Sequence, residues 1–502
     1  MGRTVIGNEI KALIKQYSEK GIKLWTEEGK LKFKAPANAL TAAMKAELKE
    51  KKERIIAYLL DSAKLLHDEE GRYEAFPLTD IQAAYLVGRT GEYSYGGVGC
   101  KVYLEMTAHG IDHAKLQEAW GKVVNRHDMT HAAVYRNGTQ CVRREYTVPE
   151  IQLYDFTGID SEEQAEKVAQ IRRELSGKQY KADAVPLYDL ALVKLADRDL
   201  ICFSIDMLIA DFTSITIMVN ELEAFYYGDG EPGALEITFR DVLMNRQENK
   251  DAQKAERAKK YWMDRIETIP EAPAMPVEES TDALSTEFEQ HNFVLGYDKW
   301  DAVTEKAKTY GLTPTSIVLN AYANVIGRWS GQKQFSLNVT MANRENVHSD
   351  IKNIVGDFTI VDILEVNLDS KKTFAQQSDS IQKQLWSDME NVDFSGVAVM
   401  RELKRAKERD VLFPVVFTST LGFRDEKMAV RERKFVLTYK ISQTPQVLID
   451  CQISEESTGI LINWDVRKGA FPEGVIEDAF AAFAAELEAL TAEESSWDSC
   501  RT

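Results

Sequence analysis

The formal charge of this chain changes sign near residue 66. Residues 1–66 carry 14 lysines and arginines against 8 aspartates and glutamates, a net charge of +6. The remaining residues carry 48 (62 − 14) against 72 (80 − 8), a net charge of −24. Such a contrast indicates separate parts with different partners. The sequence therefore predicts a small basic module followed by a large acidic body.

Length and composition exclude several classes of protein. The 502 residues are 44% hydrophobic and 28% charged, which is enough apolar material for two to four globular units. A net charge of −18 argues against nucleic acid as a partner, because nucleic-acid binding needs a basic surface. The five scattered cysteines form no CxxC pair, and there is no signal sequence and no run of 18 apolar residues. We expect a cytoplasmic protein with no metal site and no membrane partner.

The basic module, residues 1–66, has the pattern of a helix, a hairpin and a second helix. Apolar residues at Ile10, Leu13, Ile14 and Tyr17 follow helical spacing. Residues 22–25 and 31–34 alternate around a Glu-Glu-Gly turn, and a second helix is predicted to begin at Thr41.

Lysines cluster at this predicted hairpin, at Lys23, Lys30, Lys32 and Lys34. A two-stranded hairpin has free edges that can accept a further strand, and nearby lysines would favour an acidic peptide. The pattern alone fits equally well a solvated face that keeps the edge from aggregating.

The body shows mixed strands and helices. A stretch rich in Pro, Ala and small polar residues at 271–285 predicts a division into two lobes, residues 76–270 and 286–498, preceded by a linker at 67–75.

Two aspartates in the body stand in an apolar segment between a predicted strand and a helix. Asp206 and Asp211 are expected to be paired or hydrogen-bonded, since an uncompensated buried carboxylate is costly. Asp211 is suited to cap the following helix, with Ser214 in its first turn. A structural role is favoured on spacing, although a position at a strand end keeps a catalytic role open.

Other polar residues follow predicted strands. Thr418 follows the strand 413–417, Asp450 ends the apolar run 446–450, and Arg344 could be the cation that an interior aspartate needs. Such residues are usually structural. The seven histidines form no HxxH, HExxH or HHxxxD pattern, and no P-loop, GxGxxG or zinc motif occurs. Spacing alone leaves the function open.

The N-terminal module resembles the TubC-type β-hairpin docking domains of hybrid peptide and polyketide synthetases, over residues 21–59. This resemblance implies that the hairpin captures an acidic C-terminal peptide of an upstream synthetase subunit. The residues expected to bind that peptide are Lys23, Trp25, Lys30, Lys32, Phe33 and Lys34.

The body resembles the heterocyclization domains of nonribosomal peptide synthetases from Phe76 to Pro472. Its most specific feature is the DxxxxDxxS pattern of Asp206, Asp211 and Ser214, which in that family replaces the HHxxxDG of ordinary condensation domains. Further markers occur in the family's order at Phe76–Arg89, Tyr261–Trp262, Leu312–Thr315, Arg328–Ser330, Val355–Thr359, Pro414–Ser419, Ser442–Gln446, Trp464–Asp465 and Phe471–Pro472.

This resemblance implies an α/β fold of two chloramphenicol-acetyltransferase-like lobes that form a V with a central tunnel. Upstream and downstream carrier proteins would deliver thioesters on phosphopantetheine arms, so the chain itself would bind no cofactor. The amine of a tethered Cys, Ser or Thr, chosen by a downstream adenylation domain, would attack the upstream acyl thioester. The side-chain thiol or hydroxyl would then close a thiazoline or oxazoline ring with loss of water.

Site residues carry over by position. The resemblance assigns proton transfer in cyclodehydration to Asp450 and an orienting role to Thr418, with Asn343 and Gln443 lining the same site. It also implies that Asp211 pairs with Arg344 to hold the two lobes in register, while Asp206 is structural or faces the substrate.

The chain departs from the family pattern in places. Leu448–Cys451 stands where Trp-Leu-Asp-His is usual, and Asp362 adds an acid to a strand. These changes leave open an amide-only condensation domain or a non-cyclising docking or scaffold protein. A free-standing acyltransferase that uses coenzyme A thioesters is disfavoured by the missing HHxxxD histidine.

Overall fold

The computed structural model describes residues 13–14, 16–17, 22–27, 30–35, 41–56, 65, 67–91, 95–278, 285–345, 347–421, 433–456, 458–492 and 495–500. The chain forms two compact units, Met1–Glu69 with Arg344–Lys352, and Glu70–Asn343 with Asn353–Thr502.

The first unit contains the predicted hairpin. Strands β1 (Lys23–Glu27) and β2 (Lys30–Lys34) pair antiparallel, and helix α2 (Ala42–Glu50) begins where expected, because the Thr41 hydroxyl accepts the Met44 amide. A small core joins them, formed by Leu13, Tyr17, Ile22, Leu24, Leu48 and Ile55. The hairpin and second helix are confirmed; Ile10, at the start of the predicted first helix, lies outside the described residues.

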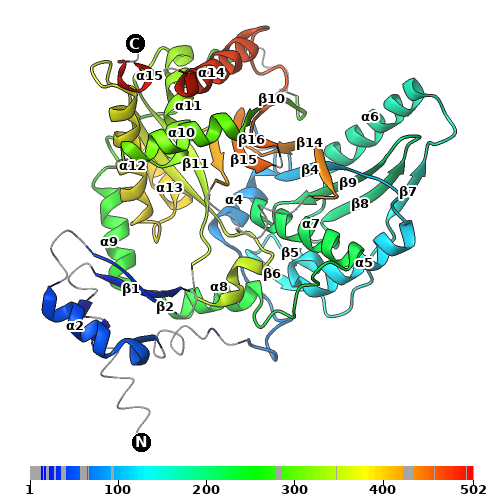
Figure 1. The fold of residues 1–502 in the computed structure, drawn as a ribbon, viewed down its shortest axis with the longest axis horizontal. Coiled ribbons are helices and arrows are strands. Elements are labelled where there is room, and N and C mark those ends of the chain that lie inside the picture. The colour runs from blue at the N-terminus through cyan, green and yellow to red at the C-terminus, as the bar shows by residue number, and fades with distance from the viewer. Residues whose placement is uncertain are drawn as a thin grey trace, which may run out of the picture. The chain divides into compact units, whose positions relative to one another are not determined.

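The first half of the larger unit is built on a five-stranded sheet of order β14-β4-β9-β8-β7 (Figure 1). Helix α6 covers one face and helices α5 and α7 lie on the other. Successive side chains of a strand point to opposite faces of the sheet, and both faces of β9 are apolar. Cys202 on β9 faces α6, and its neighbour Phe203 packs on Trp120 of α5. These elements are β4 (Lys101–Ala108), α5 (His113–Arg126), β7 (Gln152–Asp155), α6 (Ser161–Gly177), β8 (Tyr188–Lys194), β9 (Asp199–Asp206) and α7 (Phe212–Tyr227).

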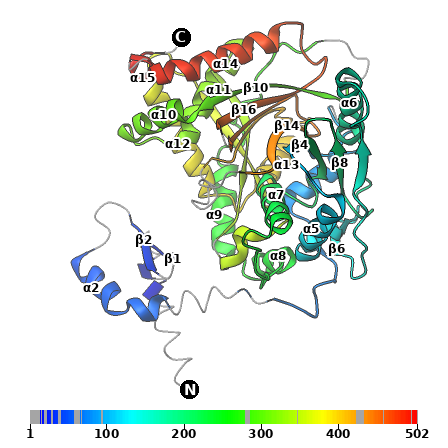
Figure 2. The ribbon, with the colours of Figure 1, turned by 45° about the vertical axis from the view of Figure 1, so that its right-hand side comes forward.

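The second half is built on a six-stranded sheet of order β10-β16-β15-β13-β11-β12, visible beside the first in Figures 1 and 2. Helices α10, α11, α12 and α14 pack on one of its faces, where they bury a large apolar core. The elements are β10 (Phe288–Gly296), α10 (Tyr297–Thr309), α11 (Pro314–Ser330), β11 (Gln334–Ala342), β12 (Thr359–Asn367), α12 (Phe374–Met389), β13 (Val415–Ser419), β15 (Ile449–Glu456), β16 (Gly459–Arg467) and α14 (Val475–Ala492).

One strand crosses the predicted division of the body. β14 (Val436–Gln443) belongs to the second half of the sequence, yet it pairs with β4 at the edge of the first sheet. The two lobes are therefore joined by a shared sheet as well as by the segment at 271–285, whose described residues, 271–278 and 285, form no helix or strand.

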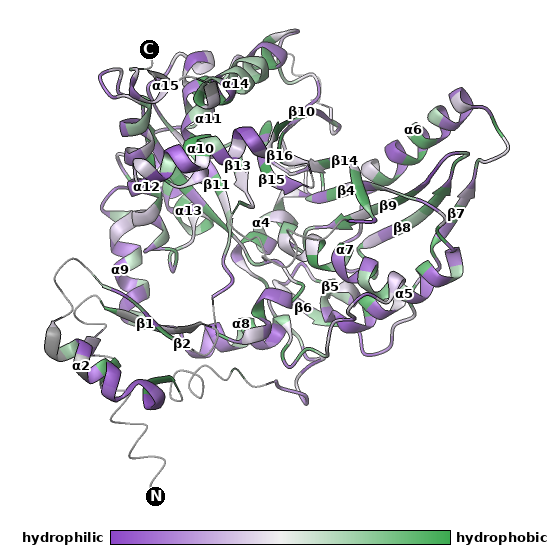
Figure 3. Cartoon of the chain, viewed as in Figure 1, coloured by the Kyte–Doolittle hydropathy of each residue, from purple (hydrophilic) through white to green (hydrophobic). Residues whose placement is uncertain are grey.

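The remaining elements surround these two sheets. They are β3 (Phe76–Pro77), α4 (Asp80–Gly88), η1 (Asp128–His131), β5 (Ala132–Val134), β6 (Thr139–Val142), α8 (Phe239–Glu248), α9 (Ala252–Met263), α13 (Gly396–Lys407) and α15 (Ser495–Asp498). The short helix η2 (Ser349–Asn353) falls almost entirely in the segment that belongs to the first unit. Hydrophobic residues concentrate on the strands, whereas helices such as α6 carry hydrophilic outer surfaces (Figure 3). Within the described ranges, no helix combines the length and the apolar character that crossing a bilayer requires.

Candidate functional site

Polar side chains form a row on one face of the six-stranded sheet, opposite the face on which helices α10, α11, α12 and α14 pack. On β15 and β16, the buried apolar Cys451, Ile453 and Trp464 face the helices, and the alternate positions face the other way. Those alternate positions hold polar groups on four neighbouring strands: Asn338 and Thr340, Thr418, Asp450 and Gln452, and Asn463 and Asp465.

Asp450 and Thr418 are brought together as predicted. The Thr418 hydroxyl donates to Asp450 Oδ1 at 2.9 Å and accepts from the Thr340 hydroxyl at 2.6 Å. Gln452 Nε2 donates to Asp450 Oδ2 at 2.9 Å. The carboxylate is thus held on both oxygens by neighbours on its own sheet.

A second buried aspartate lies directly across from Asp450. Asp465 is its register partner on β16 and is held by more donors. Its Oδ2 accepts from the Ser442 amide at 2.8 Å, the Ser442 hydroxyl at 2.7 Å and Gln452 Nε2 at 2.9 Å, and its Oδ1 accepts from Asn463 Nδ2 at 2.9 Å. This network fixes the geometry around Asp450.

The environment adjusts the acidity of this pair. Burial, together with the negative charge of Asp465, raises the pKa of Asp450 to about 6, against the hydrogen bonds of Thr418 and Gln452 and the positive charge of Lys440. Burial also raises the pKa of Asp465, while its donors oppose that rise. A carboxyl group with a pKa near 6 can both accept and release a proton near neutral pH.

The polar row opens into a cavity of about 80 Å³ between the two halves of the larger unit. The first half contributes residues from α4, β4 and the start of α7, including Tyr85, Val102 and Phe212. The second half contributes Asp450 and Thr418. We call this space the reaction cavity.

The strand that carries Asp450 differs from the prediction. The apolar run 446–450 suggested a strand ending at Asp450, but β15 begins at Ile449 and Asp450 is its second residue. Gln446 adopts a left-handed conformation with φ of 65°, so the extended backbone of a strand is interrupted after Pro445. Leu448 then joins the sheet through its amide, which donates to the carbonyl of Pro414.

Asp206 is buried and paired, as expected for a carboxylate in an apolar segment. It is 1% exposed, forms an ion pair with Arg89, and its Oδ1 accepts the Leu208 amide at 2.9 Å. Burial raises the pKa of Asp206 and Arg89 opposes that rise. The carboxylate is therefore compensated by Arg89, and whether it is structural or faces the substrate stays a prediction.

Asp211 and Ser214 tie α7 to a segment of the second half. Asp211 Oδ1 caps the helix by accepting the Ser214 amide at 2.6 Å, as predicted, and it lies 2.6 Å from the Ser214 hydroxyl. That hydroxyl lies 2.9 Å from the Gly356 carbonyl and accepts from the Gly356 amide at 3.0 Å. The pairing of Asp211 with Arg344 stays a prediction, because the two residues belong to different units; Arg344 Nη1 donates to the Ile351 carbonyl at 3.0 Å.

The other two residues predicted for the site lie beside the reaction cavity. Gln443 Nε2 donates to the Gly99 carbonyl at 3.3 Å, and its neighbours Ser442 and Thr444 form the wall. Asn343 follows β11, where its amide donates to the Phe358 carbonyl, and the wall is formed by Ala342. Their catalytic roles stay predictions.

The hairpin of the first unit presents part of the predicted peptide-binding set. Trp25 pairs with Lys32 across the hairpin and is half-buried, while Lys32, Phe33 and Lys34 are exposed. Phe33 is 51% exposed, which is unusual for a large apolar side chain. For Lys23 and Lys30 only the backbone pairing is described.

The sequence interpretation missed several members of the polar row. The sequence predictions assign to this site neither Thr340, Gln452, Asn463 and Asp465 of the row nor Ser442 on β14, which donates to Asp465. Two of these residues, Ser442 and Asp465, nevertheless stand in family markers. Polar residues two positions apart inside buried strands, as in Asp450-x-Gln452 and Asn463-x-Asp465, were the available signal.

Two sequence-family models match this chain. The model for the condensation domain matches residues 74–499, and the model for the TubC N-terminal docking domain matches residues 10–61. The chain belongs to the condensation-domain family. It carries a TubC-type docking domain ahead of the condensation domain, which confirms the predicted order.

The relatives include a pyochelin synthetase and a phenyloxazoline synthase. The chain is 32% identical to pyochelin synthetase PchF of Pseudomonas aeruginosa, over 97% of this chain and 27% of that protein. It is 32% identical to phenyloxazoline synthase MbtB of Mycobacterium tuberculosis, over 85% of this chain and 30% of that protein. The chain thus spans less than a third of the length of these relatives.

The fold matches a solved structure of the same organisation. The EpoB cyclization-docking bidomain of a nonribosomal peptide synthetase from Sorangium cellulosum is 30% identical, with a TM-score of 0.78. The match covers 97% of this chain and 98% of that one. The mixed α/β condensation fold with an N-terminal docking region is confirmed.

Proposed function

We propose that this chain is the docking and heterocyclization portion of a nonribosomal peptide synthetase. It condenses a carrier-bound acyl or peptidyl thioester with carrier-bound Cys, Ser or Thr and then closes the amide to a thiazoline or oxazoline. The observation that carries this proposal is the buried Asp450, hydrogen-bonded to Thr418 and facing a cavity between the two halves. The cyclization named for the EpoB bidomain and the oxazoline named for MbtB support the same reaction.

Condensation comes first. The amine of the downstream aminoacyl thioester attacks the upstream thioester carbonyl, the new C–N bond forms, and the upstream carrier's thiol leaves. Enclosure in the reaction cavity contributes proximity and keeps competing water away from the thioester.

Ring closure follows, with Asp450 as the proton carrier. The carboxylate takes the proton of the attacking thiol or hydroxyl and passes it to the former amide oxygen, which becomes a hydroxyl. It then takes the amide N–H proton and gives it to the departing hydroxyl, so that water leaves and the C=N bond forms. Thr418 fixes the orientation of Asp450 throughout.

The partners follow from this chemistry. Both substrates are thioesters on phosphopantetheine arms that belong to upstream and downstream carrier proteins, and a downstream adenylation domain supplies the amino acid. We place the reaction in the cytoplasm.

The docking domain is proposed to bind an acidic C-terminal peptide of an upstream subunit. The exposed Lys32 and Lys34 offer positive charge, Phe33 offers an apolar contact, and each strand of a two-stranded sheet has an open edge. Titration of the full chain with a synthetic acidic peptide should show binding that weakens with added salt. The double variant Lys32→Glu, Lys34→Glu should abolish it, and unchanged affinity would refute this surface.

The proposed reaction is tested by intact mass of the downstream carrier after both carriers are loaded and the chain is added. The natural chain should give a product one water lighter than the amide. Asp450→Asn, which nearly preserves shape, should give the amide at full mass. Full-mass amide from the natural chain, with every acceptor, would instead show an amide-only domain.

A further inference from the structure

A second cavity adjoins the reaction cavity. It is about 90 Å³ in volume and lies between α7 and the strands β4, β14 and β15. The two cavities share Val102, Phe212, Thr418 and Thr420 on their walls, so they meet beside the Asp450–Thr418 pair. We call this second space the side chamber.

About half of the residues that line the side chamber are apolar. Strand β4 and the β14 region contribute Val102, Leu104, Met106, Phe435 and Leu437, and α7 contributes Phe212, Ile215 and Val219. An apolar ligand surface would gain free energy by leaving water for such a space.

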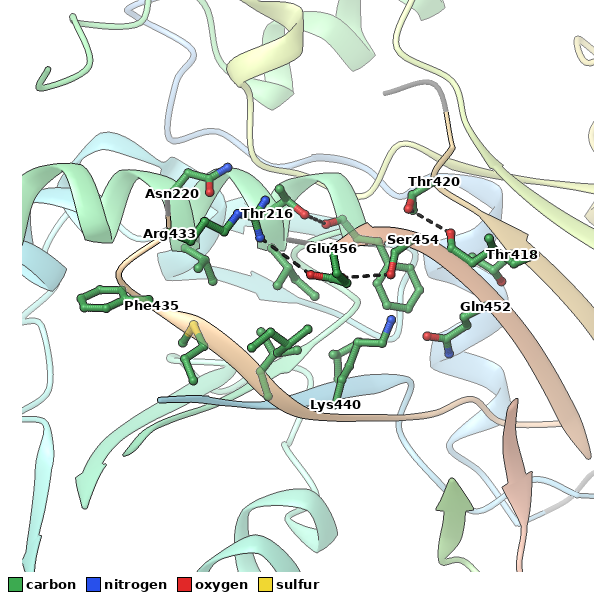
Figure 4. Close-up of a pocket in the computed structure, with 18 residues that line it drawn as sticks. Thr216, Asn220, Thr418, Thr420, Arg433, Phe435, Lys440, Gln452, Ser454 and Glu456 are labelled. Atoms are coloured by element: carbon green, nitrogen blue, oxygen red, sulfur yellow. Dashed lines mark hydrogen bonds and ion pairs between the residues drawn. The ribbon is translucent and has the colours of Figure 1, made fainter. Parts of the chain in front are cut away.

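Polar groups stand at its two ends and also between them. Figure 4 shows Thr418 and Gln452 at the end next to the reaction cavity, Asn220 and Arg433 at the other, and Lys440, Ser454 and Glu456 in between. Arg433 lies 3.9 Å from Glu456. The chamber therefore combines apolar walls with hydrogen-bonding and charged groups, and a ligand that reaches Asn220 and Arg433 needs a polar group there.

Three parts of the substrates need space, of which the phosphopantetheine arms carry amide and hydroxyl groups along their length and suit apolar walls poorly. The side chain of Cys, Ser or Thr is small and must stay at Asp450, because it becomes part of the ring. The upstream acyl group is joined to the carbon under attack and has no other place assigned to it.

We propose that the side chamber binds the upstream acyl group and selects an apolar chain or ring whose far end carries a hydrogen-bonding group. This inference rests on the proposed function and adds the chemical class of the upstream acyl group, which is the acyl donor of the reaction. Asn220, Arg433 and Glu456 are then specificity residues for that far end, and the apolar walls set its length.

The test uses the full chain, a downstream carrier loaded with Cys, and upstream carriers loaded with acetyl, hexanoyl or 6-hydroxyhexanoyl groups. The readout is amide formation by intact mass, whether or not the ring then closes. Hexanoyl should exceed acetyl in rate by about tenfold or more, since single methylenes alter such rates by about tenfold upward. The 6-hydroxyhexanoyl group should be at least as good as hexanoyl.

Variants that fill the chamber sharpen the test. Asn220→Trp and Thr216→Trp place an indole in the chamber from α7, and Thr216 is exposed, so its replacement does not disturb the core. In both variants the rate with hexanoyl should fall by about tenfold relative to the rate with acetyl, so that the preference for the longer groups is lost. Ile217→Trp, on the same helix but off the chamber wall, is the matched control.

The outcomes separate the two proposals. Equal rates for all donors in the natural chain, or equal losses in the filling variants and in the control, would overturn the chamber assignment. Absence of amide with every donor would refute the proposed function itself, and the chamber assignment with it.

Discussion

Replacement of Asp465 by Asn should move the pH dependence of ring closure to lower pH. Asp465 lies across from Asp450, and its charge is one cause of the raised pKa of Asp450. The Asn side chain keeps the shape of Asp465 and removes that charge. The pKa of Asp450 should then fall, and Asp450 would remain a proton acceptor under more acidic conditions.

The size of this effect can be estimated from the shared donor. Gln452 Nε2 lies 2.9 Å from an oxygen of each carboxylate, so these oxygens are at most 5.8 Å apart (twice 2.9 Å). At an effective dielectric constant of about 20, charges at that distance interact by about 3 kcal/mol, equivalent to a pKa change of about 2. Because burial is the larger cause of the raised pKa, we expect the acidic limb to move by about one pH unit.

The assay is single-turnover formation of the dehydrated carrier product between about pH 5 and 8.5. In the natural chain the rate should fall on the acidic side of about pH 6, where Asp450 becomes protonated. Lys440→Met should move the acidic limb in the opposite direction, to higher pH, since the Lys440 charge lowers the pKa of Asp450. General damage to the site would not move two profiles in opposite directions, and coincident profiles for all three proteins would refute Asp450 as the titrating group.

Buried groups away from the reaction cavity give three further tests. Burial raises the pKa of Asp362, and neither of its carboxyl oxygens has a hydrogen-bond partner among the described residues. As the pH rises from about 4, the Asp362 carboxyl group loses its proton in the unfolded chain but keeps it in the folded chain, so the unfolding free energy should fall. Asp362→Asn should lack this loss, and urea denaturation at pH 8 should show it to be more stable than the natural chain. Asp206→Ala should lower the unfolding free energy by about 3–5 kcal/mol, because Arg89 is left buried without its partner; a loss below about 1 kcal/mol would contradict this. Gly356→Ala should destabilise by about 1–3 kcal/mol, measured by thermal unfolding, since the added Cβ would come within 2.2 Å of the Phe239 ring.

Local patterns predicted much of the fold. The hairpin, the buried strand that became β9, and the α7 helix with its Asp211 cap were all visible, because alternation, helical spacing and capping each act over a few residues. The contribution of β14 to the first sheet was not visible. Pairing between Ser442 and Val102 joins residues 340 positions apart, and no local signal specifies such a partner.

The site was predicted in part for the same reason. Asp450 and Thr418 were found through the family resemblance, but a sequence does not show that adjacent strands place Thr340, Thr418 and Asp450 side by side. Asp465 was not predicted for the site, because it matters only through its position opposite Asp450. That position depends on the register in which β15 pairs with β16.

The altered neighbours of Asp450 carry less weight than the sequence suggested. In a strand, successive side chains point to opposite faces, so a change at position 451 is not a change in the cavity. Cys451 is fully buried in the apolar core, where it lies across from Trp464, and Leu448 belongs to the same core. The groups that touch the Asp450 carboxylate, Thr418 and Gln452, come from the opposite face and are in place. The departures from the family pattern thus alter packing behind the sheet, and they give no reason to expect that cyclisation has been lost.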